Sequence, residues 1–202
     1  MNVEFREQMP SDVEVVQSMG SDLMIYRAAR ISYGADDEPT QERLKEFIGN
    51  LLAKGHGVPF EHCSITYRLK APIFVFRQLF RYRTAAISEK SMRYTEARAE
   101  IYMPQHIAVH CPELYEDYIF NSLKSYMMLM KSGVSKEQAR AVLPLATFSE
   151  AYFTMNLRNL FHLFDQRCDE HAQAETRFIA ERMAEEAAKL FPVAMECWRE
   201  KR

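Results

Sequence analysis

The chain has 202 residues, 48% of them hydrophobic, and a formal net charge of -2 at pH 7. This length fits one domain, and the hydrophobic share is enough to build a core, which excludes a disordered protein. No overall positive field is present to recruit nucleic acid or anionic lipid, so any anion must bind at a local cluster of Arg and Lys. We therefore expect a single domain over residues 1–202 that binds neither nucleic acid nor membrane.

The cysteines and the first residues indicate a cellular compartment. Cys63, Cys111, Cys168 and Cys197 are scattered and form no CxxC pair, which is typical of a reduced intracellular protein. The segment Met1–Arg6 has charges early and no apolar signal core. No stretch approaches the roughly 18 consecutive apolar residues of a membrane span. These patterns predict a cytoplasmic protein.

The first part of the chain yields one predicted helix. Residues 12–34 have apolar spacing too mixed to assign. A helix is expected to begin at Thr40 and to end near Gly55, where glycine is a plausible stop. Apolar residues recur at helical spacing between these two points, namely Leu44, Phe47, Ile48, Leu51 and Leu52.

The next part alternates and then changes its period at a proline. Cys63–Lys70 alternates between apolar and polar residues, which predicts a half-buried strand. Pro72 stands where a helix can begin, and on that helix Arg77 and Arg81 are four residues apart and share a face. Residues 84–93 are small and polar, so we expect the helix to open there into a loop.

The second half of the chain is mostly helical in its pattern. Its predicted elements are a helix over 113–131, a short helix that starts with the capping box Ser135–Gln138, a strand over 147–155, a helix capped by Asn156 and a long helix over about 169–190. Helices with a few non-adjacent strands between them predict an α+β fold.

Basic residues gather most densely in Arg77–Arg83 and Ser88–Tyr94. The two segments hold four arginines, one lysine, two serines and a glutamine. Guanidinium groups bind phosphate through two parallel hydrogen bonds, and a Ser hydroxyl can complete such a site, so the cluster suits a nucleotide phosphate. The alternative is a solvated basic face paired with Glu96 and Glu100.

Two histidine-containing segments raise the question of a metal. Gly55–His62 holds two histidines and a glutamate around a rigid proline, which suits a cofactor contact, but the spacing is not a zinc pattern. His106 and His110 are four residues apart, but Pro104 and Pro112 argue against a helix that would bring them together. We predict no metal at either place.

Two further arginines are embedded in apolar or helix-forming sequence. Arg140 and Arg167 would be costly in such a setting unless they were paired, so each implies a buried ligand or a carboxylate partner. Asp165, Asp169 and Glu170 are the carboxylates available to Arg167.

Several common catalytic patterns are absent. The sequence has no GxGxxG or GxxxxGK phosphate loop, which argues against a Rossmann unit that binds flavin or nicotinamide. It also has no Gly-x-Ser-x-Gly elbow and no cysteine between obvious base partners, so the protein offers no good candidate for a nucleophile.

Four segments, in this order, resemble the flavin-dependent thymidylate synthase family. The family signature is R-H-R followed by S-x-N-E-x-S-x-R-Y, and Arg81–Tyr94 has the same length and matches the arginines at both of its ends, Arg81 and Arg83 at the start and Arg93 before the final tyrosine. The upstream G-H-x-x-P-F-E-H block, the A-R-x-V-L-P block and the segments Leu157-Arg158 and His171-Ala172-Gln173 are also similar. Together the blocks cover about residues 28 to 180, which makes the match far more specific than one motif.

The resemblance implies a fold, a reaction and an assembly. The fold would be of the thymidylate synthase-complementing type, with mixed helices packed around a small, mostly antiparallel sheet. FAD would be reduced by NADPH, methylenetetrahydrofolate would supply a carbon, and dUMP would become dTMP. The flavin then carries the hard chemistry, which agrees with the lack of a protein nucleophile. Each active site would be shared between subunits of a homotetramer.

The resemblance also implies roles for individual residues. The predicted nucleotide-binding residues are Gln78, Glu89, Ser91, Arg93, Arg140 and Arg167. Arg167 and Ser91 are the predicted catalytic-site residues: Arg167 would favour negative charge on the uracil as C5 becomes nucleophilic, and Ser91 would contact phosphate or ribose. The residues predicted on the flavin or folate side are His56, Glu61, Arg81, Tyr82, Arg83, Ser88, Glu89, Asn156, Arg158, His162 and His171.

Four positions depart from the family pattern. Tyr82 replaces the signature His, Ala86 its first Ser and Ser88 its Asn, and His162 stands where Asn is frequent. Tyr82 can hydrogen-bond or stack on a flavin, but it does not titrate near neutral pH as His does. Ala86 and Ser88 remove volume and an amide from the predicted wall of the site.

Three hypotheses follow for the function. The first is a flavin-dependent thymidylate synthase with a divergent signature. The second is an enzyme on the same scaffold that methylates or hydroxymethylates C5 of UMP or another uridine nucleotide, since the smaller side chains would make room for a ribose 2′-hydroxyl. The third is a catalytically inactive nucleotide- or RNA-binding protein that keeps the arginine cluster.

Overall fold

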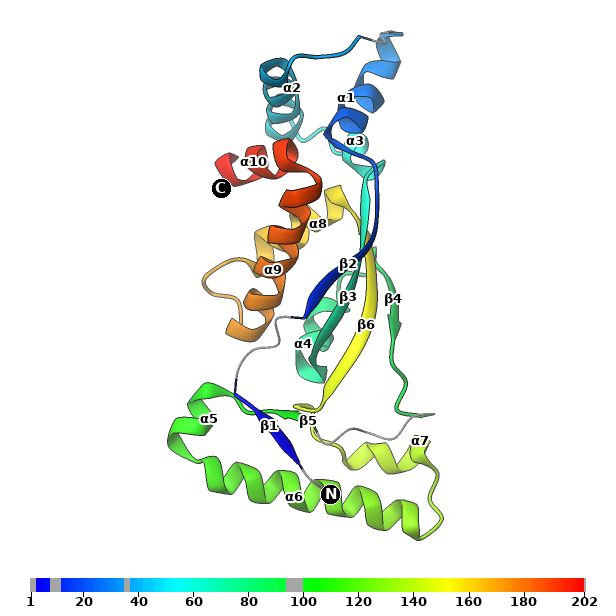
Figure 1. Cartoon of the computed structure of the whole chain (residues 1–202), viewed down its shortest axis with the longest axis vertical. Coiled ribbons are helices and arrows are strands. Elements are labelled where there is room, and N and C mark those ends of the chain that lie inside the picture. Colours follow the sequence, from blue (N-terminus) through cyan, green and yellow to red (C-terminus); the bar gives the residue numbers. More distant parts are fainter. Residues whose placement is uncertain (1–2, 8–11, 35–36, 94–99, 202) are drawn as a thin grey trace. The chain divides into compact units, whose positions relative to one another are not determined.

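The computed structural model describes residues 3–7, 12–34, 37–93 and 100–201 (Figure 1). Helices are combined with a four-stranded sheet of order β2-β3-β6-β4 and a two-stranded sheet of β1 and β5, which confirms the predicted α+β class. The strands are β1 Glu4–Arg6, β2 Val13–Met19, β3 Ser64–Pro72, β4 Ala86–Glu89, β5 Glu100–Tyr102 and β6 Phe148–Asn156.

The described residues group into two compact units. Unit 1 comprises those in Met1–Pro10, Lys70–Leu79 and Ser88–Ala151, and unit 2 those in Ser11–Leu69, Phe80–Ile87 and Tyr152–Arg202. The single domain over residues 1–202 stays a prediction. The helices of unit 1 are α4 Ile73–Leu79, α5 Gln105–His110, α6 Pro112–Lys131, α7 Lys136–Ala139 and the 3₁₀ helix η2 Arg140–Val142. Those of unit 2 are α1 Asp22–Arg30, the 3₁₀ helix η1 Ile31–Tyr33, α2 Gln41–Ala53, α3 Val58–Glu61, α8 Leu157–Arg167, α9 Ala174–Leu190 and α10 Pro192–Lys201.

Strand β3 has the alternation that the sequence predicted. Ile65, Tyr67 and Leu69 are all fully buried, while the residues between them are partly or fully exposed. The strand pairs antiparallel with β2, and the register shifts between Val15 and Gln17. The Tyr67 hydroxyl donates a hydrogen bond to the backbone oxygen of Met183 at 3.0 Å, so a buried polar group on this strand is satisfied.

Two predicted helix starts in unit 2 are confirmed by their caps. The Thr40 side chain accepts a hydrogen bond from the Arg43 amide at the start of α2, and Asn156 does the same for the Asn159 amide in α8. Such caps satisfy amides that have no partner within the helix. Helix α8 turns an apolar face inward, as its spacing predicted, and the buried residues are Leu157, Leu160, Phe161, Leu163 and Phe164.

The last predicted helix begins later than expected, at Ala174. The Asp169 carboxylate accepts a hydrogen bond from the His171 amide at 2.9 Å, and the Asp169 carbonyl accepts one from Ala172 at 3.0 Å. Aspartate forms such local turns readily, and this one separates α8 from α9. Helix α10 follows after a short break and was not predicted.

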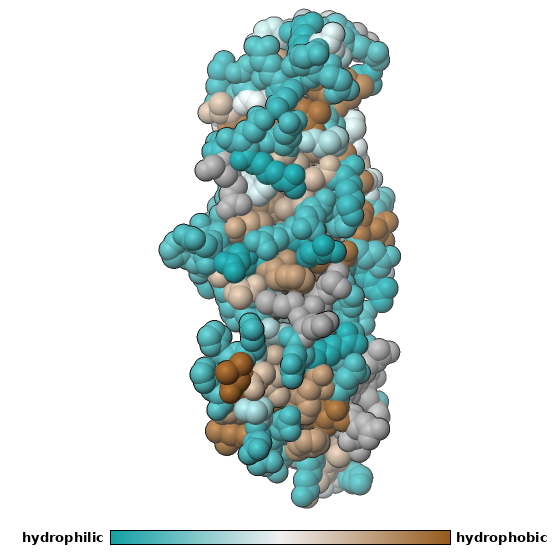
Figure 2. Space-filling view, turned by 60° about the vertical axis from the view of Figure 1, so that its left-hand side comes forward, coloured by the Kyte–Doolittle hydropathy of each residue, from teal (hydrophilic) through white to brown (hydrophobic). Residues whose placement is uncertain are grey.

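In unit 1, helix α6 matches the predicted helix over 113–131. Ile119 and Leu123 pack in a buried cluster with Ile101 of β5 and Ala146. Next to this cluster the buried Glu100 carboxylate pairs with Arg6 at 2.8 Å and Lys70 at 2.7 Å. Figure 2 shows hydrophobic residues at the surface over α5 and α6, and the exposed ones include Val109, Leu114 and Met128.

Three local predictions were wrong. Residues 84–93 were expected to be a loop, but Ala86–Glu89 form β4 at the edge of the sheet, where solvent-facing residues need not alternate with apolar ones. Helix α4 ends at Leu79, so Arg81 lies in the following turn and does not share a helical face with Arg77. His106 and His110 do lie on one helix, α5, because Pro104 precedes it as its cap and Pro112 begins α6.

Candidate active site

Unit 1 contains a pocket of about 420 Å³ with a strongly cationic wall. Arg77 of α4, Lys90 after β4 and Arg140 of η2 face it together with one carboxylate, that of Glu89. The remaining lining residues are Ile73, Ser91, Met92, Ala141, Leu143 and Leu145. Three cations against one anion, with a hydroxyl beside them, form a site for a phosphate-sized anion. We call it the cationic pocket.

The residues of the cationic pocket are held by local contacts. The Arg140 Nε donates to the carbonyl of Glu137 at 3.2 Å, and the Glu137 carboxylate pairs with Arg93 at 2.9 Å. Ser91 is half-buried, and its Oγ accepts a hydrogen bond from the Arg93 amide at 3.3 Å. Arg140 itself is exposed, so water can solvate its charge, and burial does not force it to have the ligand or carboxylate partner that the sequence implied.

Glu100, one of the two acids proposed to neutralise the basic segments, is paired with residues outside those segments. Glu100 pairs with Arg6 and Lys70, and Arg93 pairs with Glu137. Glu96 lies outside the described residues, as does Tyr94 of the signature.

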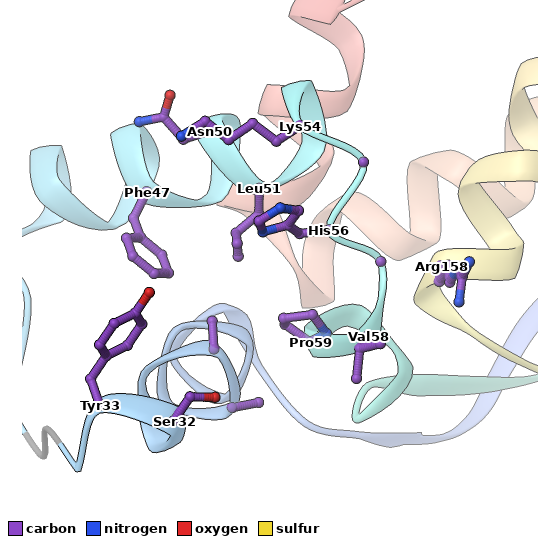
Figure 3. Close-up of a pocket in the computed structure, with 14 residues that line it drawn as sticks. Ser32, Tyr33, Phe47, Asn50, Leu51, Lys54, His56, Val58, Pro59 and Arg158 are labelled. Carbon is purple, nitrogen blue, oxygen red and sulfur yellow. The ribbon is translucent and has the colours of Figure 1, made fainter.

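Unit 2 contains a larger pocket, of about 710 Å³, with a different lining. Tyr33 of η1 and Phe47 of α2 point toward one another (Figure 3). His56, in the loop that follows α2, lies beside Leu51 of that helix. The other lining residues are Ala28, Ala29, Ser32, Asn50, Lys54, Gly55, Gly57, Val58, Pro59 and Arg158. Aromatic rings with a few polar groups suit a planar, partly polar ligand. We call it the aromatic pocket.

Gly57 allows Arg158 to approach the wall of the aromatic pocket closely. A Cβ at position 57 would lie 2.5 Å from the Arg158 Nε, which is closer than side-chain contacts allow. Arg158 also forms an ion pair with Glu61, which belongs to the same Gly55–His62 segment. In this segment the glycine leaves room for the Arg158 side chain, and the glutamate pairs with its guanidinium.

Tyr82, His162, Gln166 and Arg167 form a third group in unit 2. The Tyr82 hydroxyl donates to Gln166 Oε1 at 2.7 Å, and the Arg167 Cζ lies 5.6 Å from the centre of the Tyr82 ring. Burial raises the pKa of the Tyr82 hydroxyl, and the charge and hydrogen bond of Arg167 oppose that rise. The hydroxyl therefore remains a protonated donor at neutral pH.

Arg167 does not use the carboxylates that the sequence offered it. Asp165 accepts a hydrogen bond from the Trp198 indole at 2.7 Å, and Asp169 accepts from the His171 amide. Within the part of the chain that the structure describes, the Arg167 Nε is buried and has no hydrogen-bond partner. A buried donor without a partner is costly. Of the two partners that the sequence implied for Arg167, a carboxylate is therefore not found among these residues, and a bound ligand stays a prediction.

The predicted site residues thus fall into separate places. Glu89, Ser91 and Arg140 meet in the cationic pocket, His56 and Arg158 in the aromatic pocket with Glu61 beside them, and Tyr82, His162 and Arg167 in the third group. Asn156 is engaged in capping α8. The remaining predicted residues line neither pocket and do not belong to the third group; they are Gln78, Arg81, Arg83, Ser88, Arg93, Asn156 and His171.

Some functional candidates were missed from the sequence. Arg77 and Lys90 belonged to the recognised basic segments but were not assigned to the site. Ser32, Tyr33 and Phe47 gave no usable signal, because residues 12–34 could not be assigned and Phe47 reads as part of an ordinary apolar helix face. Metal ligands do not gather: the described ranges hold no group of three His, Cys, Asp or Glu side chains around one point.

Comparison with known proteins places this arrangement in one class of enzymes. A family model described as thymidylate synthase complementing protein matches residues 14–193. A flavin-dependent thymidylate synthase of Thermosipho africanus is 39% identical over 182 residues, covering 81% of this chain and 79% of the relative. One from Thermotoga neapolitana is 40% identical over 173 residues, with the same coverage of the two chains.

Solved structures agree with the sequence relatives. The crystal structure of a UMP/dUMP methylase PolB from Streptomyces cacaoi, bound with 5-Br dUMP, has a TM-score of 0.91 and 32% identity over 98% of this chain and 97% of that one. The same methylase bound with 5-Br UMP has a TM-score of 0.89 and 31% identity, over 99% and 97% of the two chains. The chain belongs to the thymidylate synthase complementing family, and the resemblance seen in its motifs is confirmed.

Helices of membrane-spanning length and hydropathy are not found in the residues that the structure describes.

Proposed function

We propose that this protein is a flavin-dependent methyltransferase that transfers and reduces a one-carbon unit onto C5 of a uridine nucleotide. In the principal form of this proposal the nucleotide is dUMP, the product is dTMP, methylenetetrahydrofolate supplies the carbon and NADPH reduces FAD. The observation that carries the proposal is the cationic pocket, in which Arg77, Lys90 and Arg140 face one cavity in a chain of this family.

The cationic pocket supports binding of the nucleotide phosphate. Two guanidinium groups and an ammonium surround about 420 Å³, and the half-buried Ser91 adds a hydroxyl. Arginine pairs with phosphate through two parallel hydrogen bonds, which fixes direction as well as charge. Glu89 is the single acid in the lining and would accept a hydrogen bond from a ribose hydroxyl or a base N–H rather than contact phosphate.

The aromatic pocket supports binding of FAD. Tyr33 and Phe47 offer ring faces for a planar ring system, and Lys54, His56 and Arg158 offer donors for its polar groups. Gly57 leaves room for a guanidinium against the backbone. These residues fit a dinucleotide that combines planar rings with phosphates. When bound, FAD would supply the reducing equivalents that the side chains cannot.

Arg167 supports the chemical step. Its guanidinium is partly buried, and its Nε has no hydrogen-bond partner among the described residues, so it can donate to a ligand. A fixed cation beside the uracil would favour negative charge on the ring and make C5 more nucleophilic. This role needs no protein nucleophile, because the flavin supplies the reducing equivalents.

A second candidate substrate is UMP. One relative of known structure is described as a UMP/dUMP methylase and was solved with 5-Br UMP as well as 5-Br dUMP. In this chain Ala86 and Ser88 lie exposed on β4, where they present less volume than larger polar side chains would. We infer that this strand can tolerate a ribose 2′-hydroxyl.

We also infer a cytoplasmic homotetramer with shared active sites. Predicted site residues that line neither pocket, such as Arg81, Arg83 and His171, are exposed, as they would be if they served a site on another subunit. The exposed apolar residues over α5 and α6 support association (Figure 2). Light scattering should give a mass near four times the 23.7 kDa of the chain, and a monomer would contradict this inference.

The proposal is tested by the visible absorption spectrum of the purified protein, titrated with FAD with and without dUMP or UMP. We expect a flavin band that binds and then shifts when one of the nucleotides is added. Flavin binding with neither nucleotide perturbing the band would contradict the uridine nucleotide assignment. No flavin binding under any condition would instead favour the catalytically inactive nucleotide- or RNA-binding protein.

A further inference from the structure

Tyr82 is buried although the two residues that flank it in the turn after α4 are exposed. Arg81 and Arg83 on either side of it are exposed, whereas Tyr82 is only 8% exposed. Its hydroxyl donates to Gln166 Oε1 at 2.7 Å, and its ring meets the His162 ring edge-on, with 6.1 Å between the centroids. His162 and Gln166 are one helical turn apart on α8, so both hold the ring in one orientation.

The face of this fixed ring is occupied by Arg167. The guanidinium carbon lies 5.6 Å from the ring centre, within the range of a cation–π contact. Arginine stacks well on aromatic rings because its charge is spread over a plane. The Arg167 Nε is buried without a hydrogen-bond partner among the described residues. The Tyr82 ring therefore fixes the position of the guanidinium, as a carboxylate partner does for many arginines. Unlike a carboxylate, it does not neutralise the charge.

We propose that Tyr82 is a positioning residue that orients Arg167 toward the uridine nucleotide. This inference rests on the proposed function. A long arginine side chain loses conformational freedom when it binds a ligand, and a ring that already fixes it removes part of that cost. Tyr82 thus raises nucleotide affinity through Arg167, and Gln166 contributes by fixing the ring.

Substitutions at Tyr82 separate the ring from the hydroxyl. Tyr82→Leu removes the ring and should weaken nucleotide binding roughly tenfold, the size of a partly desolvated cation–π contact. Tyr82→Phe keeps the ring but loses the hydroxyl, and with it both the bond to Gln166 and the hydrogen bond with Arg167. It should weaken binding by about threefold at most and thereby rescue most of the loss, because the ring still lies against Arg167. Tyr67→Phe is the matched control, because it removes a buried tyrosine hydroxyl bond on β3, away from this group, and should leave nucleotide affinity unchanged.

A double-mutant cycle tests whether Tyr82 acts through Arg167. Nucleotide dissociation constants are measured for the wild type, Tyr82→Leu, Arg167→Leu and the double variant. Without Arg167 there is nothing for the ring to orient, so Tyr82→Leu should then change affinity by less than about twofold. An equal loss in both backgrounds would overturn the proposal, because it would mean a direct contact or a general structural effect.

Ligand-free crystal structures keep this inference separate from the proposed function. In the wild type and Tyr82→Phe the Arg167 guanidinium should lie in one position over the ring, and in Tyr82→Leu it should leave that position. An unmoved Arg167 in Tyr82→Leu would overturn the positioning role. If the wild type binds neither dUMP nor UMP, the proposed function fails, and the same crystal structures still decide whether Tyr82 orients Arg167.

Discussion

The two pockets of this protein differ in the kind of ligand that their walls can recognise. The cationic pocket of unit 1 collects two arginines and a lysine, and its recognition is electrostatic. The aromatic pocket of unit 2 sets Tyr33 against Phe47 and adds donors from Lys54, His56 and Arg158, so it suits planar rings that carry polar groups. The difference separates two jobs of the proposed reaction, because a nucleotide phosphate needs charge and a flavin needs ring faces.

The largest effect should come from removing a cation of the first pocket. Arg140→Gln should weaken dUMP or UMP binding roughly 10- to 100-fold, the cost of losing charge-assisted hydrogen bonds, with flavin affinity unchanged. Calorimetric titration measures both. The control is Lys124→Gln, which removes an exposed charge from α6 outside the pocket and should change neither affinity. Equal losses of nucleotide affinity in the two variants would show that the effect comes from the net charge of the protein and not from a contact in the pocket.

The next effect should come from the aromatic wall. Tyr33→Ala should weaken FAD binding about five- to tenfold, since stacking on one ring contributes of the order of 1 kcal/mol. Tyr33 is 79% exposed, so folding stability should hardly change. Tyr118→Ala on α6, where the ring is 61% exposed, is the matched control. A flavin fluorescence titration that gives the same affinity for both variants would show that Tyr33 does not face the cofactor.

A smaller effect is expected where Gly57 makes room for Arg158. Gly57→Ala would place a Cβ against the Arg158 side chain, which must shift away from Glu61. We expect FAD affinity to fall by about two- to fivefold, because an exposed ion pair is worth less than about 1 kcal/mol. Glu61→Gln should produce a similar loss, and the double variant little more. Additive losses would indicate that Gly57 and Glu61 act separately.

The smallest expected effect is the dependence of nucleotide affinity on ionic strength, which distinguishes the cationic pocket from the aromatic pocket. Raising the ionic strength from about 0.05 to 0.15 M shortens the range of exposed charges. Nucleotide affinity should fall by roughly two- to fivefold if exposed Arg77, Lys90 and Arg140 bind the phosphate. Inorganic phosphate should compete in the same salt range. Salt-independent nucleotide binding would contradict an electrostatic phosphate site.

The fold was predictable where one physical signal decides an element. Thr40 and Asn156 cap helices through side-chain oxygens, and β3 buries every second residue, so local sequence was sufficient there. Residues 12–34 were not assignable because β2, α1 and η1 follow one another within a short span, each with a different period. Strand β4 was missed because it is a short, mostly exposed edge strand whose few residues show no alternating apolar pattern.

The candidate site was predictable in its charges and not in its assembly. A dense group of arginines is visible in any sequence, and Ser91 and Arg140 indeed meet in one pocket. That Tyr33 and Phe47 face one another depends on how η1 and α2 pack, which no local pattern encodes. Burial was equally hard to foresee: Arg140 lies exposed, while Tyr82 is buried between exposed arginines.

The central claim is that this chain methylates a uridine nucleotide with the help of a flavin. It is tested most directly by incubating the protein with FAD, NADPH, methylenetetrahydrofolate and either dUMP or UMP, and by analysing the nucleotide by mass spectrometry. The account predicts a product heavier by one methylene group, formed only when FAD is present and lost in Arg167→Leu. Bound flavin without any change in the mass of either nucleotide would contradict it.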